Sequence, residues 1–180
     1  MIVFLGGFFG SGRESLADKL ADTLGFFCLD VYSRKDRWRA LQGGVLREYV
    51  REPKHDADTL CIYERVVEEF PLLSRMYPDV VIHDSFHRRS PRTYLLDAAR
   101  EHFGDPVFVW IEASDERAYE RFLRRRAMGV ISDVERAVAL RRRQREEFEQ
   151  FVDTPTKILN DGSGRDALPI LSRLVQEAVV

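Results

Sequence analysis

The sequence has few of the features that mark disulfide-rich, membrane-spanning or strongly basic proteins. Its two cysteines, Cys28 and Cys61, have the spacing of neither a metal site nor a redox motif. No apolar run approaches the roughly 20 residues that a membrane-spanning helix needs. The formal net charge of −2 gives no overall basicity that would favour nucleic acid. We therefore expect a cytoplasmic protein with neither a nucleic-acid nor a membrane partner.

Internal repeats, low-complexity tracts and Gly/Ser/Pro linkers are also missing, and the N-terminus lacks the basic segment of a signal peptide. What the chain does have is enough apolar side chains for one full core, because 44% of its 180 residues are hydrophobic and 32% are charged. We expect a single domain over residues 1–180.

Short apolar segments alternate with amphipathic ones along the chain. The apolar segments predict buried strands at residues 2–5, 26–30, 79–84, 107–111 and 156–159. Helices are predicted at residues 12–24, 33–51, 58–76, 91–102, 115–126, 133–151 and 167–179. Strands separated by helices favour a parallel sheet that is covered on both faces. The predicted fold class is therefore α/β, with a five-stranded parallel sheet in a three-layer α/β/α arrangement.

A glycine-rich turn joins the first predicted strand to the first predicted helix. Residues 7–15 read GFFGSGRES, and Gly7 and Gly12 have the spacing of the Walker A pattern, G-x-x-x-x-G-K-[ST]. A strand, a glycine turn and a helix N-terminus together form an anion site, because unpaired N–H groups and the helix dipole point toward the ligand. An ordinary glycine-rich turn is the alternative, but the flanking strand and helix favour a phosphate-binding loop.

Two residues depart from the Walker A pattern. Arg13 replaces lysine, which keeps the positive charge but exchanges a compact ammonium group for a planar guanidinium. Glu14 replaces the magnesium-binding hydroxyl, and its carboxylate either coordinates magnesium or repels the phosphates. Ser15 lies one position, or about 100°, further round the helix, so it is a poor substitute for that hydroxyl. Phosphate binding is compatible with both changes. Catalytic turnover depends on whether Arg13 and Glu14 can take over the roles of the lysine and the hydroxyl.

Acidic residues end two of the predicted strands. Asp84 ends the third strand, where a Walker B acid would hold magnesium through a water; a carboxylate that caps the next turn is the alternative. Asp30 ends the second strand, and ligands of open parallel sheets bind beyond the carboxyl ends of strands. Asp30 is therefore a candidate base toward an acceptor hydroxyl. Arg34, Arg37 and Arg88 are candidates for an acceptor phosphate, with a solvated basic helix as the alternative for the first two.

Arginines are concentrated in the two helices predicted over residues 115–126 and 133–151. Arg121 and Arg125 are four residues apart, so they share one helix face. A helix–loop–helix with inward arginines can close over ATP and neutralise the charge that develops in phosphoryl transfer. Ordinary surface ion pairing with neighbouring glutamates is the alternative for most of these arginines.

Together, these features resemble the P-loop kinase group that contains adenylate kinase, dephospho-coenzyme A kinase and related small-molecule kinases. The resemblance covers nearly the whole chain. It rests on Gly7–Ser15, Asp30, Asp84, Val109–Glu116 with Arg121 and Arg125, and Ile158–Ser163. It implies a fold of the P-loop nucleoside-triphosphate-hydrolase type with a helical lid over about residues 121–145. It also implies ATP and Mg²⁺ as cofactors.

The residues themselves and the resemblance together give each candidate site residue an expected role. The nucleotide-binding set is Gly7, Gly10, Ser11, Gly12, Arg13, Glu14, Ser15, Asn160 and Gly162. The catalytic set is Arg13, Asp30, Asp84, Arg121 and Arg125. The acceptor-binding set is Asp30, Arg34, Arg37 and Arg88, and the metal ligands are Glu14 and Asp84.

The expected function is ATP-dependent phosphorylation of a small molecule such as a nucleoside, a nucleotide or a cofactor precursor. The alternative is a nucleotide-binding module with impaired catalysis that acts through a protein partner. Neither the acceptor nor the oligomeric state follows from the sequence.

Overall fold

A computed structural model of the chain describes residues 1–31, 56–151, 155–162 and 166–178. The helix predicted over residues 33–51, with Arg34 and Arg37, lies outside the described residues.

The centre of the fold is a five-stranded parallel sheet. Its strands are β1 (Ile2–Gly6), β2 (Phe27–Asp30), β3 (Val80–His83), β4 (Val107–Glu112) and β5 (Thr156–Leu159), in the order β2-β3-β1-β4-β5. Each apolar segment of the sequence forms one of these strands, because strands buried on both faces need near-continuous apolar runs. The predicted five-stranded parallel sheet is confirmed.

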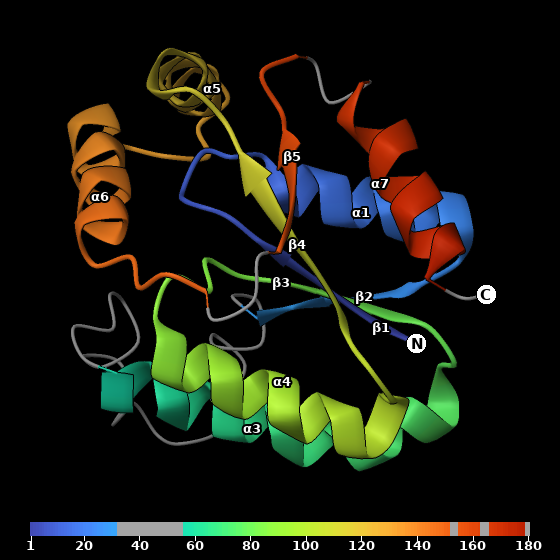
Figure 1. Cartoon of the computed structure of the whole chain (residues 1–180). Coiled ribbons are helices and arrows are strands. Elements are labelled where there is room, and N and C mark those ends of the chain that lie inside the picture. The colour runs from blue at the N-terminus through green and yellow to red at the C-terminus, as the bar shows by residue number, and fades with distance from the viewer. Residues whose placement is uncertain (32–55, 152–154, 163–165, 179–180) are drawn as a thin grey trace.

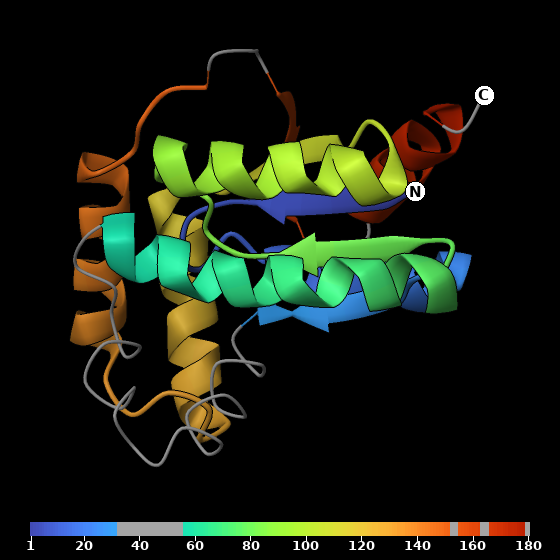
Figure 2. The same ribbon diagram turned by 90° about the horizontal axis from the view of Figure 1, so that it is seen from below.

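Helices cover both faces of the sheet. They are α1 (Arg13–Leu24), α3 (Asp56–Met76), α4 (Arg89–Phe103), α5 (Asp115–Ala127), α6 (Val134–Glu146) and α7 (Ala167–Glu177). Helices α1 and α7 lie on one face, α3 and α4 on the other, and α5 and α6 stand beyond one end of the strands (Figure 1). The view from below shows α3 and α4 side by side against the sheet (Figure 2). The predicted three-layer α/β/α arrangement is confirmed, and none of the described helices is long and apolar enough to cross a membrane.

The core has two large layers and one small one. Leu29, Ile82 and Phe70 belong to the layer between the sheet and α3 and α4. Val3, Leu5 and other side chains of the opposite face pack against α1 and α7. A separate small cluster, formed by Ala118, Phe122, Val134 and Ala137, holds α5 to α6.

The register of the strands places the loops of the candidate site at one edge of the sheet. Leu5 on β1 pairs with His83 on β3, and Gly6 pairs with Trp110 on β4. Three neighbouring parallel strands therefore end at the same edge, and the loops that follow them meet there.

Helix α6 is shorter than predicted, because it ends at Glu146 and not at Phe151. The residues after it run back across the sheet edge. Phe148 and Phe151 pack against Trp110, and the Glu149 N–H donates a hydrogen bond to the carbonyl of His87. Helical periodicity continued past residue 146, but the packing of two half-buried aromatic rings against Trp110 outweighs it.

Candidate functional site

The loop between β1 and α1 has the backbone of an anion-binding turn. Gly10 and Gly12 have φ angles of 83° and 85°, in the left-handed region that favours glycine. Gly12 is the N-cap of α1, and because it has no side chain it cannot cap the N–H groups of the first helical turn. The turn is closed by a 2.9 Å hydrogen bond from the Ser11 N–H to the Phe8 carbonyl. The first turn of α1 therefore keeps N–H groups for a ligand.

Close packing around the loop also requires its glycines. A Cβ atom at Gly10 would lie 2.8 Å from the ring of Phe122, and one at Gly12 would lie 2.6 Å from the Asn160 Nδ2 atom. Phe122 belongs to α5 and Asn160 directly follows β5. The loop is thus enclosed by elements that are more than 100 residues away in the sequence.

Arg121 on α5 binds the outer side of the loop. One guanidinium nitrogen donates to the carbonyls of Gly10 and Ser11 at 2.9 and 2.8 Å, and the other donates to the Asn160 carbonyl. The Asn160 Nδ2 atom adds a 2.9 Å hydrogen bond to the Ser11 carbonyl. Burial lowers the pKa of Arg121. Arg121, a candidate lid arginine, and Asn160, a candidate nucleotide-binding residue, therefore both bind the Ser11 carbonyl.

Arg13 takes the place of the Walker A lysine, and its guanidinium is bound within the loop. The side chain is buried and donates to the carbonyls of Gly7 and Phe8 at 2.7 and 3.1 Å. Its Nε atom has no hydrogen-bond partner in the described part of the chain. The positive charge expected from the sequence is therefore at the loop, but part of its hydrogen-bonding capacity is used by the protein.

Glu14 forms an ion pair with Arg125, which lies near the end of α5. The Arg125 guanidinium and the Glu14 carboxylate are 2.8 Å apart, and both side chains are partly exposed. This pair links the first turn of α1 to the predicted lid. The structure thus brings together a candidate metal ligand and a candidate lid arginine.

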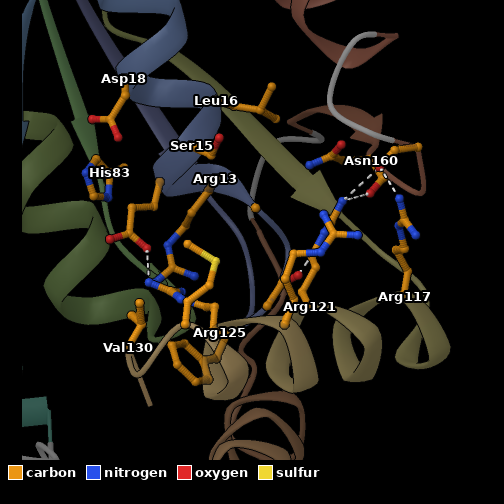
Figure 3. Close-up of a pocket in the computed structure, with 17 residues that line it drawn as sticks. Arg13, Ser15, Leu16, Asp18, His83, Arg117, Arg121, Arg125, Val130 and Asn160 are labelled. Carbon is orange, nitrogen blue, oxygen red and sulfur yellow. Dashed lines mark hydrogen bonds and ion pairs between the residues drawn. The ribbon is translucent and has the colours of Figure 1, made fainter.

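These residues line one cavity of about 610 Å³. Its walls come from the loop, from α1, from α5 and from the turn after β5. They include Gly10, Gly12, Arg13, Glu14, Ser15, Arg121, Arg125, Asn160 and Gly162 from the predicted sets, and Asp18, His83, Arg117 and Met128 in addition. Figure 3 shows Asp18 and His83 at one end and Asn160, Arg117 and Arg121 at the other. The second end carries two arginines, whereas acidic and basic side chains are mixed at the first.

The strand-end acids lie next to this cavity and are held by protein groups. Asp84 is buried, and its carboxylate accepts hydrogen bonds from the Tyr63 hydroxyl at 3.1 Å and the Ser85 N–H at 2.7 Å. Asp30 lies at the end of β2, with a carboxylate oxygen 3.9 Å from Nε2 of His83. The register of β2 and β3 places these two residues opposite each other.

Arg88 does not project freely toward an acceptor. Its side chain is buried, and its guanidinium lies 2.8 Å from the Glu147 carboxylate. The same carboxylate lies 3.5 Å from Nε2 of His87. Glu147 follows α6, so this pair fixes the lid-proximal chain to the loop after β3.

The loop after β3 contains a backbone outlier that sequence reasoning missed. Phe86 has a φ angle of 47°, which is uncommon for an aromatic residue. Its buried ring packs edge-on against Phe4 and next to Tyr63. The preceding Ser85 carbonyl accepts a 3.3 Å hydrogen bond from the Gly7 N–H. Burial of the ring compensates for a backbone conformation that joins this loop to the loop at residues 7–15.

Helix α6 is attached to the loop by two buried polar side chains. The Gln144 amide oxygen accepts a 2.7 Å hydrogen bond from the Phe9 N–H. Arg141 donates to the carbonyls of Phe9 and Ala113 and forms an ion pair with Asp115. No sequence pattern singles out Gln144, because a single glutamine in an arginine-rich helix has no distinctive spacing.

No family model and no curated protein sequence matches this chain, whereas solved structures match it over nearly its whole length. A sugar kinase from Janibacter sp. HTCC2649 is 17% identical with a TM-score of 0.68, covering 97% of this chain and 94% of that one. A gluconokinase from Sinorhizobium meliloti 1021 is 22% identical with a TM-score of 0.65, covering 98% and 94%. The Mycobacterium tuberculosis APS kinase, in complex with AMPPNP and APS, is 16% identical with a TM-score of 0.67, covering 97% and 96%. The resemblance to P-loop kinases is confirmed at the level of the fold.

Proposed function

We propose that the chain is an ATP-dependent phosphotransferase that acts on a small hydroxyl-bearing molecule and binds the phosphates of ATP at residues 7–15. The observation that carries this proposal is the convergence of the glycine loop, Arg121 and Asn160 on one cavity at the carboxyl edge of a parallel sheet. The likeness in fold to gluconokinase and APS kinase supports the same reaction class.

Unpartnered polar atoms around the cavity fit a nucleotide. The Oδ1 atom of Asn160, the Oγ atom of Ser11 and the Nε atom of Arg117 are buried without a hydrogen-bond partner among the described residues. Buried polar atoms of this kind are usually satisfied by a ligand or by water. We place the base near Asn160 and Arg117, and the phosphates at the N-terminus of α1. Bound there, ATP would supply the phosphoryl group that is transferred.

Arg121 prepares the loop for phosphate. By binding the Ser11 carbonyl, it fixes the orientation of the peptide unit between Ser11 and Gly12. Since a trans peptide directs its C=O and N–H in opposite directions, the Gly12 N–H is left for an anion. Arg13 places a fixed positive charge within the same loop. Asp30 remains our proposal for the base that accepts the acceptor's proton.

The carboxylates assigned to magnesium do not fit a metal ion as they are arranged. Glu14 is neutralised by Arg125, and Asp84 is bound by Tyr63 and Ser85. A magnesium ion at Glu14 would require that ion pair to open. We therefore assign no catalytic step to magnesium.

The second candidate function is a nucleotide-binding module without turnover that acts through a protein partner. Two specific contacts favour it. Arg13 is bound to the loop's own carbonyls, and Glu14 brings a negative charge to the cavity where phosphates would bind. Both residues replace groups that support transfer in P-loop enzymes.

The two functions are separated by measuring ADP release from ATP across a panel of sugars, sugar acids, nucleosides and cofactor precursors. Wild type is compared with Arg13→Lys/Glu14→Ser, and Arg126→Lys/Glu116→Ser serves as a control at exposed positions. We expect acceptor-dependent ADP release by wild type and by the control. If wild type turns over no acceptor and the loop substitution restores activity, the protein is the non-catalytic module.

A further inference from the structure

We propose that Asp18, Cys28 and His83 bind a thiophilic divalent cation such as Zn²⁺. One donor atom from each side chain lies within 4.8 Å of the other two. Carboxylate, thiolate and imidazole are donors that zinc accepts together. Asp18 and His83 also line the proposed nucleotide cavity, but none of the three donors is a residue that we propose to bind nucleotide, so the metal site would remain if the kinase proposal failed.

The three donors come from three elements that the fold fixes relative to one another. Asp18 lies on α1, Cys28 on β2 and His83 at the end of β3. Cys28 belongs to the core layer under α1, whereas its neighbour Leu29 faces α3 and α4. The alternation of strand side chains therefore points Cys28 toward α1. In sequence the three residues are too dispersed to form a recognisable metal motif.

His83 is a buried imidazole with unused hydrogen-bonding capacity. Its side chain is 3% exposed, and it lines the cavity together with Asp18. Within the described part of the chain its ring makes no hydrogen bond, and its Nε2 atom lies 3.9 Å from an Asp30 carboxylate oxygen. A metal ion would use one of the ring nitrogens, and Asp30 lies where a carboxylate can orient the imidazole.

The carboxylates around Cys28 also favour a cation. Asp18, Asp30 and Asp22 are close enough to act electrostatically on its thiol. Arg13 opposes a cation near His83, but it is one positive charge against these carboxylates. Zinc binds the thiolate, so binding should release the thiol proton.

The distances are compatible with zinc after a small contraction. Tetrahedral bonds of about 2.0–2.3 Å place pairs of ligand atoms about 3.3–3.8 Å apart. The Cys28 Sγ atom is already 3.7 Å from an Asp18 carboxylate oxygen. Asp18 is exposed, which leaves access from solvent and room for a water as the fourth ligand. Thiol and imidazole donors make Mg²⁺ a poor occupant.

The test is titration of the nucleotide-free protein with Co²⁺, a spectroscopic substitute for Zn²⁺, followed by competition with Zn²⁺. We expect one Co²⁺ per chain with a thiolate-to-cobalt charge-transfer band that Zn²⁺ abolishes. Cys28→Ser should remove the band, and Asp30→Asn should weaken binding about 10- to 100-fold. The matched controls are Cys61→Ser and His102→Asn at exposed positions, which should bind as wild type does.

The proposal is overturned if folded wild type binds no Co²⁺, if the bound ion shows no thiolate band, or if the band is lost with Cys61→Ser. Because a buried substitution such as His83→Asn can prevent folding, Asp18→Asn at the exposed ligand provides a second variant. Its circular dichroism should match wild type while its Co²⁺ affinity falls at least about tenfold. Unchanged affinity in Asp18→Asn would remove it as a ligand and sink the three-residue site.

Discussion

At the scale of single residues, the phosphate loop depends on glycines for two separable reasons. Gly10 has both a left-handed backbone and a neighbour, the Phe122 ring, in the space where a Cβ atom would lie. Gly25 has the same kind of backbone, with a φ angle of 76°, but no atom within 4 Å of its hypothetical Cβ. Substitutions at Gly10 and Gly25 therefore separate the free-energy cost of a left-handed backbone from the cost of steric overlap.

We predict that Gly25→Ala lowers the free energy of unfolding by about 1 kcal/mol, the cost of left-handed backbone alone. Gly10→Ala should cost about 2–4 kcal/mol, because overpacking against Phe122 is added. Chemical denaturation of both variants measures the difference. Equal losses would mean that the packing of α5 on the loop is not as tight as described.

Glu14 is the residue at which the electrostatics of the cavity can be tested directly. Glu14→Gln keeps the shape of the side chain, removes a negative charge beside the phosphates and releases Arg125 from its ion pair. We predict that the dissociation constant of ATP falls by about two- to fivefold, a change of the size that partly exposed charges produce. Calorimetry on this variant and on the exposed control Glu116→Gln measures it. Weaker binding would contradict the repulsion and favour a direct role for the carboxylate.

At the scale of elements, α5 and α6 are less free than a lid spanning residues 121–145 would be. Arg121, Arg141 and Gln144 all contact the backbone of the phosphate loop. Moving either helix as a whole would break these hydrogen bonds. Leaving a donor or acceptor without a partner there costs free energy. The exposed connection around Met128 and Val130, together with Arg125, is the part of this unit that can move at low cost.

We predict that Gln144→Ala destabilises the protein by about 1–3 kcal/mol, because the partly buried Phe9 N–H loses its acceptor. The same change should increase the hydrogen-exchange rate of the Phe9 amide. The exposed Gln176→Ala serves as the control and should alter neither quantity. Normal protection of Phe9 in Gln144→Ala would show that another group satisfies this amide.

The attachment of α6 should also depend on pH through Asp115. Its hydrogen bond from Arg141, aided by the charge of Arg145, holds the pKa of Asp115 below its usual value. A carboxylate with a lowered folded pKa stabilises above its unfolded pKa of about 3.9, and this contribution is lost as the pH falls through the folded value.

Asp115→Asn should therefore lower the thermal midpoint at pH 7, and the difference from wild type should shrink below about pH 4. Melting curves across this range measure it, with the fully exposed Asp105→Asn as the control. A difference that is the same at pH 3 and pH 7 would contradict the ion-pair account.

At the scale of the whole molecule, the local hydrophobic pattern was enough to predict the layers of the fold. The contacts within the candidate site depend instead on packing between segments that are distant in sequence. The five apolar runs were sufficient for the sheet: β1 and β3 are buried throughout, and the edge strands β2 and β5 each keep one buried apolar side chain. The loop at residues 7–15 could be recognised because its residues are contiguous in sequence. The predicted end of α6 was wrong, since the packing of Phe148 and Phe151 on Trp110 cannot be read from helical periodicity.

Contacts between residues that are distant in sequence could not be predicted from local sequence patterns. The sequence marks Arg13 and Glu14 as departures from the Walker A pattern, but their contacts with Gly7 and Arg125 depend on the folded loop and on α5. The cluster of Asp18, Cys28 and His83 likewise exists only because β2 and β3 pair under α1.

The central claim is that the loop at residues 7–15 binds the phosphates of a nucleotide. Calorimetric titration of wild type with ATP and with adenosine tests it most directly. We predict that ATP binds and that adenosine binds at least about tenfold more weakly, a loss of about 1.4 kcal/mol or more. Equal affinity for ATP and adenosine, or no binding of ATP by the folded protein, would contradict the account.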